Sequence, residues 1–173
     1  MPNSFVFSLI GPDRAGIVDE ISAVVEAKGG IWVSSRFMRL GGQFAGVAMI
    51  TVDETNADGL ANGLRTLDAK DNLTVTFARS TAQESNEIEN RKLYLLSAIG
   101  PDRPGVVHEA SHAMAGMNVS IDELSADTES ASMAGGETFK LRAELRAPAN
   151  IDADDLKDAL EEALPDYMID IDA

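Results

Sequence analysis

Apolar and polar residues recur with two different periods along the first half of the chain. Short apolar runs bounded by glycine, proline or charged residues are typical of strands, and apolar residues three or four positions apart are typical of helices. The predicted strands cover residues 4–10, 31–40, 44–52 and 73–78, and the predicted helices cover residues 17–28 and 56–70. Gly29-Gly30 ends the first helix, and Gly41-Gly42 joins the two middle strands.

The second half of the chain repeats this order of elements. Its predicted strands cover residues 93–99, 118–129, 138–147 and 167–171, its predicted helices cover residues 104–116 and 153–164, and a longer loop covers residues 130–137. We therefore predict an α+β fold of two ferredoxin-like βαββαβ units, at residues 1–81 and 92–173. A polar linker at residues 82–91 joins them, and both helices pack on one face of each antiparallel sheet.

A nine-residue string marks the same place in both halves. Ile10-Gly11-Pro12-Asp13-Arg14-Ala15-Gly16-Ile17-Val18 returns as Ile99-Gly100-Pro101-Asp102-Arg103-Pro104-Gly105-Val106-Val107. In each half the string joins the first strand to the first helix, where backbone amides point outward and attract anions. The recurrence indicates a tandem duplication, so any function of this turn is expected twice.

Each residue type in the string suggests a role. We expect the first glycine to let the chain leave the strand sharply, and the aspartate to cap the helix through its carboxylate. The second glycine serves either tight packing of helix on sheet or close approach of a ligand. The arginine pairs either with a neighbouring acid or with a ligand carboxylate. Both alternatives stay open at the level of sequence.

Charge and composition narrow the classes of partner. The formal net charge is −15, of which −2 falls on residues 1–80 and −13 on residues 81–173. So acidic a surface repels phosphate backbones, which argues against direct binding of nucleic acid. The excess of negative charge either keeps the protein soluble or forms a surface that binds a basic protein partner. The chain has no cysteine, no basic leader before its first apolar run and no apolar run long enough to span a membrane, and we expect a cytoplasmic protein.

One motif in the second half matches the zinc-binding pattern of metalloproteases. His108-Glu109-Ala110-Ser111-His112 matches the H-E-x-x-H zinc pattern on a predicted helix. We expect the apolar residues of that helix to be its buried side, and both histidines lie opposite them; these residues are Val106, Val107, Ala110, Ala113 and Met114. No further histidine or cysteine can complete a zinc site. We expect an exposed helix face, with no metal, no cofactor and no catalytic residue.

The doubled string, on a βαββαβ frame, resembles the ACT domain family. Tandem pairs of this kind look most like the glycine cleavage system transcriptional repressor family. That resemblance implies ligand contacts from the turn and from the second strand of a facing unit. The residues it points to are Gly11, Asp13, Arg14, Gly16, Ile17, Ser34, Ser35, Gly100, Asp102, Arg103, Gly105, Val106 and Asn118. The family asparagine at the second strand is Asn118, which we match with Ile31 in the first half, so one of the two pockets is expected to be altered or empty.

The resemblance implies a non-enzymatic regulator. It is expected to bind a small amino acid, such as glycine, between ACT units, and to act on a transcriptional activator by protein contact; a homo-oligomer is compatible with this. The alternative is a protein-interaction or assembly module whose ligand sites are vestigial. An enzyme fragment is less favoured, although formyltetrahydrofolate deformylases carry a similar ACT unit, because the chain has no room for a catalytic domain after its second unit.

Overall fold

The computed structural model describes residues 2–80, 90–130 and 136–173, which form two compact units, Met1–Ala82 and Gln83–Ala173. The predicted α+β fold is confirmed in both. Residues 81–89 of the linker region and 131–135 of the long loop lie outside the described residues, so the predicted linker bounds stay a prediction.

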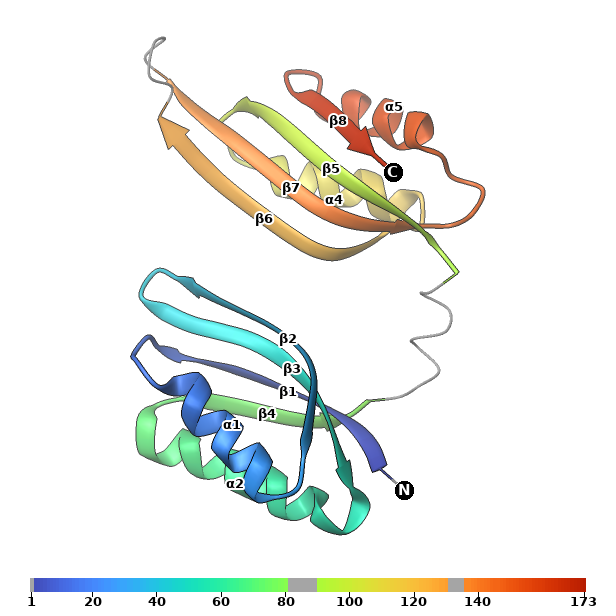
Figure 1. The fold of residues 1–173 in the computed structure, drawn as a ribbon. Helices are drawn as coiled ribbons and strands as arrows, with labels where there is room; N and C mark the ends of the chain where they lie inside the picture. Colours follow the sequence, from blue (N-terminus) through green and yellow to red (C-terminus); the bar gives the residue numbers. More distant parts are fainter. Residues whose placement is uncertain (1, 81–89, 131–135) are drawn as a thin grey trace. The chain divides into compact units, whose positions relative to one another are not determined.

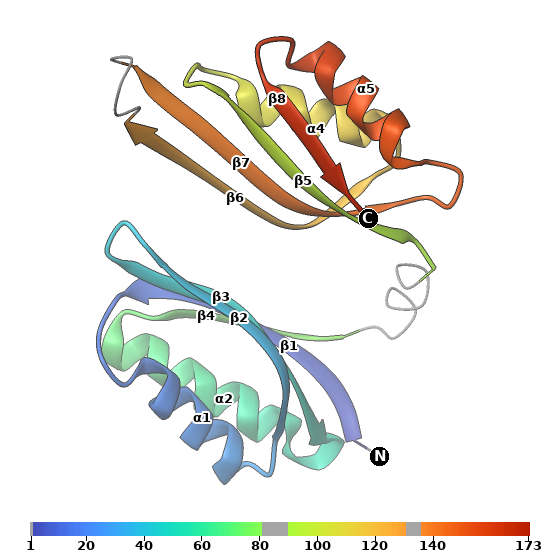
Figure 2. The same ribbon diagram turned by 45° about the horizontal axis from the view of Figure 1, so that its top comes forward.

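The first unit has two helices and four strands (Figure 1). Its elements are β1 (Pro2–Pro12), α1 (Ile17–Ala27), β2 (Ile31–Leu40), β3 (Gln43–Asp53), α2 (Glu54–Asp71) and β4 (Thr74–Arg79). The antiparallel sheet has the strand order β2-β3-β1-β4. Both helices cover the same face of it, as Figure 2 shows from a second direction.

The second unit repeats this arrangement. Its elements are β5 (Lys92–Pro101), α4 (Val106–Gly116), β6 (Ser120–Ser130), β7 (Glu137–Ala147), α5 (Ala153–Ala163) and β8 (Met168–Asp172). The strand order β6-β7-β5-β8 matches that of the first unit strand for strand. Both sheets also carry a bulge at the same position of their edge strand, between Trp32 and Ser34 and between Ile121 and Glu123.

Each unit has its own core between sheet and helices. In the first, Phe7, Ile50, Leu60 and Leu64 are fully buried. In the second, Met114, Leu141, Leu145, Leu156, Leu160 and Leu164 are fully buried. Apart from the tyrosines Tyr94 and Tyr167, no side chain with a polar group is buried among the described residues. Burial of roughly 25 cal/mol per Å² of apolar surface is therefore the main favourable contribution to each fold.

The start of α5 shows how local sequence sets an element. The Asp152 side chain accepts a hydrogen bond from the Asp155 amide at 2.9 Å, and the Asp155 carboxylate accepts one from the Asp152 amide at 3.0 Å. This capping box satisfies two amides that the first turn leaves without helical partners. It confirms that the acidic residues here begin a helix.

Candidate functional site

The first glycine of each string lies inside a strand. β1 and β5 run on through Gly11 and Gly100 to the following proline, so the expected sharp exit from the strand at this glycine is wrong. A Cβ at Gly100 would lie 2.6 Å from the ring of Tyr167, and a Cβ at Gly11 would lie 2.7 Å from the carbonyl oxygen of Asn72. These glycines make room for the chain as it enters the last strand of each sheet.

The second glycine of each string begins the helix. Gly16 and Gly105 are the N-cap residues of α1 and α4, with φ of 89° and 94°, a conformation that side chains other than glycine rarely adopt. Neither N-cap makes a side-chain hydrogen bond. The expectation that Asp13 and Asp102 cap these helices is therefore wrong. Backbone conformation explains the glycine in both copies.

Both aspartates bond to residues of the hairpin between the second and third strands of their own unit. The Asp13 carboxylate forms an ion pair with Arg39 at 2.8 Å, and the Asp13 amide donates to the carbonyl of Gly42. The Asp102 amide likewise donates to the carbonyl of Glu137 at 3.3 Å. These bonds connect the first turn to the hairpin between β2 and β3, and the second turn to the hairpin between β6 and β7.

The arginines of the two strings are held by glutamates of the same unit. Arg14 donates through both Nη atoms to the two carboxylate oxygens of Glu20, each at 2.7 Å. The two Nη atoms of Arg103 likewise donate to the two carboxylate oxygens of Glu109, at 2.9 and 2.6 Å. We call each of these pairs a clasp. A bidentate guanidinium–carboxylate pair fixes both partners in position, and the glutamate oxygen then lies 3.9 Å from a Cβ built at Gly16 and 3.2 Å from one at Gly105.

The second turn is braced more heavily than the first. The Tyr167 hydroxyl donates to the carbonyl of Pro101, and the Arg103 guanidinium lies 5.9 Å from the centre of the Tyr167 ring. The hydrogen bond from Arg103 lowers the pKa of Glu109, and the same bond raises the pKa of Arg103. Burial raises the pKa of Tyr167. Leu73 precedes β4 where Tyr167 precedes β8, so the first turn lacks this hydroxyl.

Asn118 ends a helix. It follows the C-cap of α4 with φ of 58°, and Gly29 follows the C-cap of α1 with φ of 69°. The registers pair Ile31 with Thr51 and Ser120 with Arg146, which makes Ser120 the counterpart of Ile31. Our match of Asn118 with Ile31 is therefore wrong, and its counterpart is Gly29. Asparagine is one of the few residues that tolerate this left-handed conformation.

The predicted contacts are not all brought together within one unit. The turn with Arg103 lies before α4, and Asn118 lies after it, about 16 Å apart for an 11-residue helix. Ser34 and Ser35 lie beside the bulge of β2, opposite Met49 and Ala48, and so point to opposite faces of the sheet. Ile17 and Val106 are buried under the first turns of their helices. The predicted ligand roles stay predictions.

The H-E-x-x-H motif lies on an exposed helix face, as expected. His108 and His112 are exposed and their ring centres are 6.0 Å apart, while Glu109 belongs to a clasp. No group of three metal-binding side chains occurs in the described part of the chain. Val107, expected to be buried, is 40% exposed. None of the helices in residues 2–80, 90–130 and 136–173 is long and apolar enough to cross a membrane.

Sequence reasoning missed the clasp glutamates and Tyr167. A signal for the glutamates existed, because a glutamate follows the arginine by six residues in both copies. Tyr167 had no such signal, since its partners Gly100, Pro101 and Arg103 are more than sixty residues away.

Comparisons with known proteins agree with this architecture. The ACT domain family model matches residues 3–78. An unknown protein from Galdieria sulphuraria is 25% identical with a TM-score of 0.85, over 99% of this chain and 97% of that chain. A provisionally assigned glycine cleavage system transcriptional repressor is 20% identical with a TM-score of 0.72, over 99% of this chain and 97% of that chain. Both similarities extend across the two units.

Other similarities are weaker. A formyltetrahydrofolate deformylase from Pseudomonas putida is 19% identical with a TM-score of 0.39, over 47% of this chain and 29% of that chain, which supports no functional argument. No curated protein matches the chain.

Proposed function

We propose that this chain, whose first unit matches the ACT domain family model and whose second unit has the same strand order, is a non-enzymatic regulator that binds a small amino acid, such as glycine, at its repeated turns. Occupied turns favour one conformation of the protein, and a transcriptional activator that prefers that conformation is bound or released accordingly. The structural similarity to the provisionally assigned glycine cleavage system transcriptional repressor supports this choice of ligand and partner.

One observation carries the proposal, the exposed glycine N-cap that both copies share. The Glu20 oxygen lies 3.9 Å from a Cβ built at Gly16, and the Glu109 oxygen lies 3.2 Å from one built at Gly105, so Gly16 is the more open of the two. An incoming carboxylate could therefore reach the first amides of α1, where the helix dipole favours negative charge. The second copy keeps the same φ and the same exposed N-cap.

The clasps predict how such a ligand would compete. Glu20 already fills the guanidinium fork of Arg14, and Glu109 fills that of Arg103. A ligand carboxylate must therefore displace a glutamate to reach either arginine. Weakening the clasp should strengthen ligand binding, because the competing carboxylate is removed while the guanidinium stays.

Calorimetric titration of the full chain with a panel of amino acids tests this proposal. We expect one or more to bind, and Glu20→Gln or Glu109→Gln to bind more tightly by several-fold. Glu26→Gln is the matched control, since it removes one charge from exposed α1 surface outside the clasp. No heat from any amino acid, with wild type and both variants, would refute the sensor. Equal tightening in Glu26→Gln would refute the competition.

The filled forks also favour a second candidate, a protein-interaction module with vestigial ligand sites. In that case the clasps only stabilise the helix starts. Protein partners captured on the immobilised full chain, with and without glycine, separate the two candidates. Capture that changes with glycine supports the sensor, and capture that ignores glycine, together with silent calorimetry, supports the module.

A further inference from the structure

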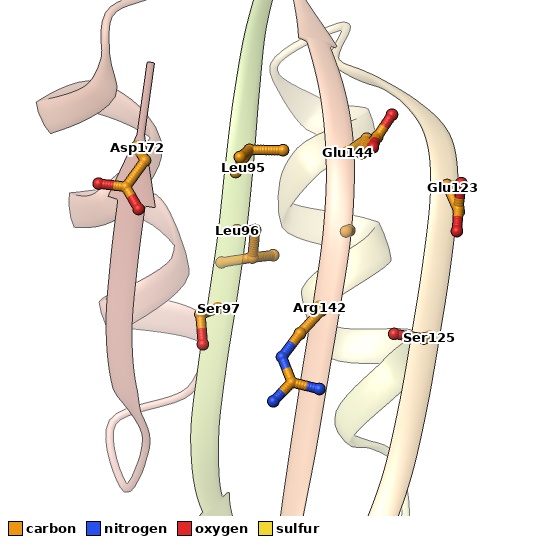
Figure 3. Close-up of a pocket in the computed structure, with 9 residues that line it drawn as sticks. Leu95, Leu96, Ser97, Glu123, Ser125, Arg142, Glu144 and Asp172 are labelled. Carbon is orange, nitrogen blue, oxygen red and sulfur yellow. The ribbon is translucent and has the colours of Figure 1, made fainter.

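The second sheet carries a depression on the face opposite its helices. It measures about 330 Å³ and is lined by side chains of all four strands of the sheet (Figure 3). This volume lies at the lower end of the range for small-molecule sites. The depression is separate from the turns and clasps described above, and it involves none of their residues.

The sheet register builds two rows across this face. Arg142 of β7 lies directly opposite Ser97 of β5 and Ser125 of β6. One strand repeat further along, Glu144 lies opposite Leu95, and Leu95 lies opposite Asp172 of β8. Figure 3 shows the Arg142 guanidinium directed toward the Ser97 side, away from Glu144. Asp170 of β8 lies opposite Ser97 at the end of the first row. A row in which Arg142 lies between two serines thus stands beside an acidic row.

Arg142 differs from its neighbours on the same strand. Lys140 pairs with Glu129 at 2.5 Å, and Arg146 pairs with Asp122 at 2.6 Å. The Arg142 side chain makes no hydrogen bond or ion pair with any residue that the structure describes. The Arg142 charge also helps Lys140 to lower the pKa of Glu129. The central cation of the strand is therefore available to a ligand.

The first unit shows that the fold does not require these rows. Its register places Val47 where the second unit has Arg142, and Met49 where the second unit has Glu144. The same sheet in the same unit type is thus built with apolar side chains at both positions. The charged pair is a property of the second unit alone.

We propose that this face of the second sheet binds a linear zwitterion of dipeptide length. Its carboxylate binds the Arg142 guanidinium and the Ser97 hydroxyl, toward which Arg142 is directed, and its ammonium binds Glu144. Residues two apart on a strand lie about 7 Å apart. An extended dipeptide separates its charged ends by about 6 Å, whereas an α-amino acid separates them by only about 2.5 Å.

The test is NMR titration of the ¹⁵N-labelled full chain with glycylglycine. We expect saturable shifts at the amides of Ser97, Ser125 and Arg142, with glycine producing none there. Arg142→Gln should weaken binding at least tenfold. Arg146→Gln is the matched control, because it removes one charge from the same strand and face but from an existing ion pair, and it should leave binding unchanged.

A second comparison tests the ammonium end. Wild type should bind 6-aminohexanoate more tightly than hexanoate, and Glu144→Gln should abolish that difference. The proposal is overturned if glycylglycine causes no shifts at these amides at millimolar concentration, if Arg142→Gln binds as wild type does, or if glycine saturates the same amides. The proposed amino-acid sensor at the turns is unaffected by any of these results, since its residues lie elsewhere.

Discussion

Replacing Gly100 by alanine should destabilise the second unit through a clash with one ring. The new methyl group would lie 2.6 to 2.7 Å from three atoms of the Tyr167 ring, whereas ordinary van der Waals contact begins at 3.4 Å. The ring must therefore retreat by about 0.8 Å at its closest atom. It has little freedom to do so, because it is only 7% exposed and its hydroxyl donates to Pro101, the next residue along.

The expected loss is about 2 kcal/mol of unfolding free energy, within the roughly 1–3 kcal/mol range for overpacked cores. For a unit of this size that corresponds to a melting temperature lower by roughly 8–16 °C. Native-state amide exchange is the suitable assay because it reports each unit separately. Protection should fall for the core amides of β5 and β7, and it should stay unchanged in β1 and β3.

Two further variants make the reasoning refutable. Gly116→Ala, at the end of α4 with no atom within 4 Å of the new methyl, should be neutral or stabilising by about 0.5–1 kcal/mol. Tyr167→Ala removes the ring that the new methyl group would meet, so the combination with Gly100→Ala should cost about 1 kcal/mol less than the two single losses added together. Unchanged stability in Gly100→Ala, or strict additivity in the double variant, would show that the ring does not require this glycine.

Four other outcomes follow from particular contacts. Asn118→Ala should lower the unfolding free energy by about 1 kcal/mol while Asn118→Gly lowers it little, because asparagine and glycine tolerate φ of 58° better than alanine does. Urea denaturation would show the difference, and equal losses would contradict this reasoning. Asp152→Ala should lose about 1 kcal/mol by removing the capping box of α5, seen as faster exchange of its first amides, and unaltered exchange would contradict it. The Arg103 clasp lowers the pKa of Glu109, so its stabilisation is present above the unfolded pKa and is lost as pH falls through the folded value. Glu109→Gln should thus flatten the acid limb of a urea-midpoint profile, and an unchanged limb would refute the role. Burial raises the pKa of Tyr167, so its contribution to stability is fully present below the unfolded pKa and is lost as pH rises through the raised folded pKa. Tyr167→Phe should remove this alkaline decline in stability.

Local pattern was enough to predict the elements of both units. Strand and helix periods depend on which side of an element is buried, and that information lies within ten to eighteen residues of chain. Leu60 and Leu64 on α2, and the alternation of Val75 and Phe77 on β4, illustrate this. The repeated string added the duplication, which no single element could have revealed.

The candidate site was predicted only in outline. The string located both turns, yet it did not show which residue begins each helix, because aspartate and glycine both suit an N-cap. Gly16 holds that position only because the backbone there has positive φ, while Asp13 bonds to the hairpin at Gly42 instead. The hairpin is some thirty residues away, and its position follows from sheet pairing.

The sequence by itself determined that this protein has two similar units, which residues face each core, and where its repeated turns lie, because these depend on interactions between near neighbours. The tertiary structure alone decided that Tyr167 packs on Gly100 and that Arg142 stands between two serines. Those neighbours are fixed by the register of strands distant in sequence, and a shift of one residue would move every side chain to the opposite face.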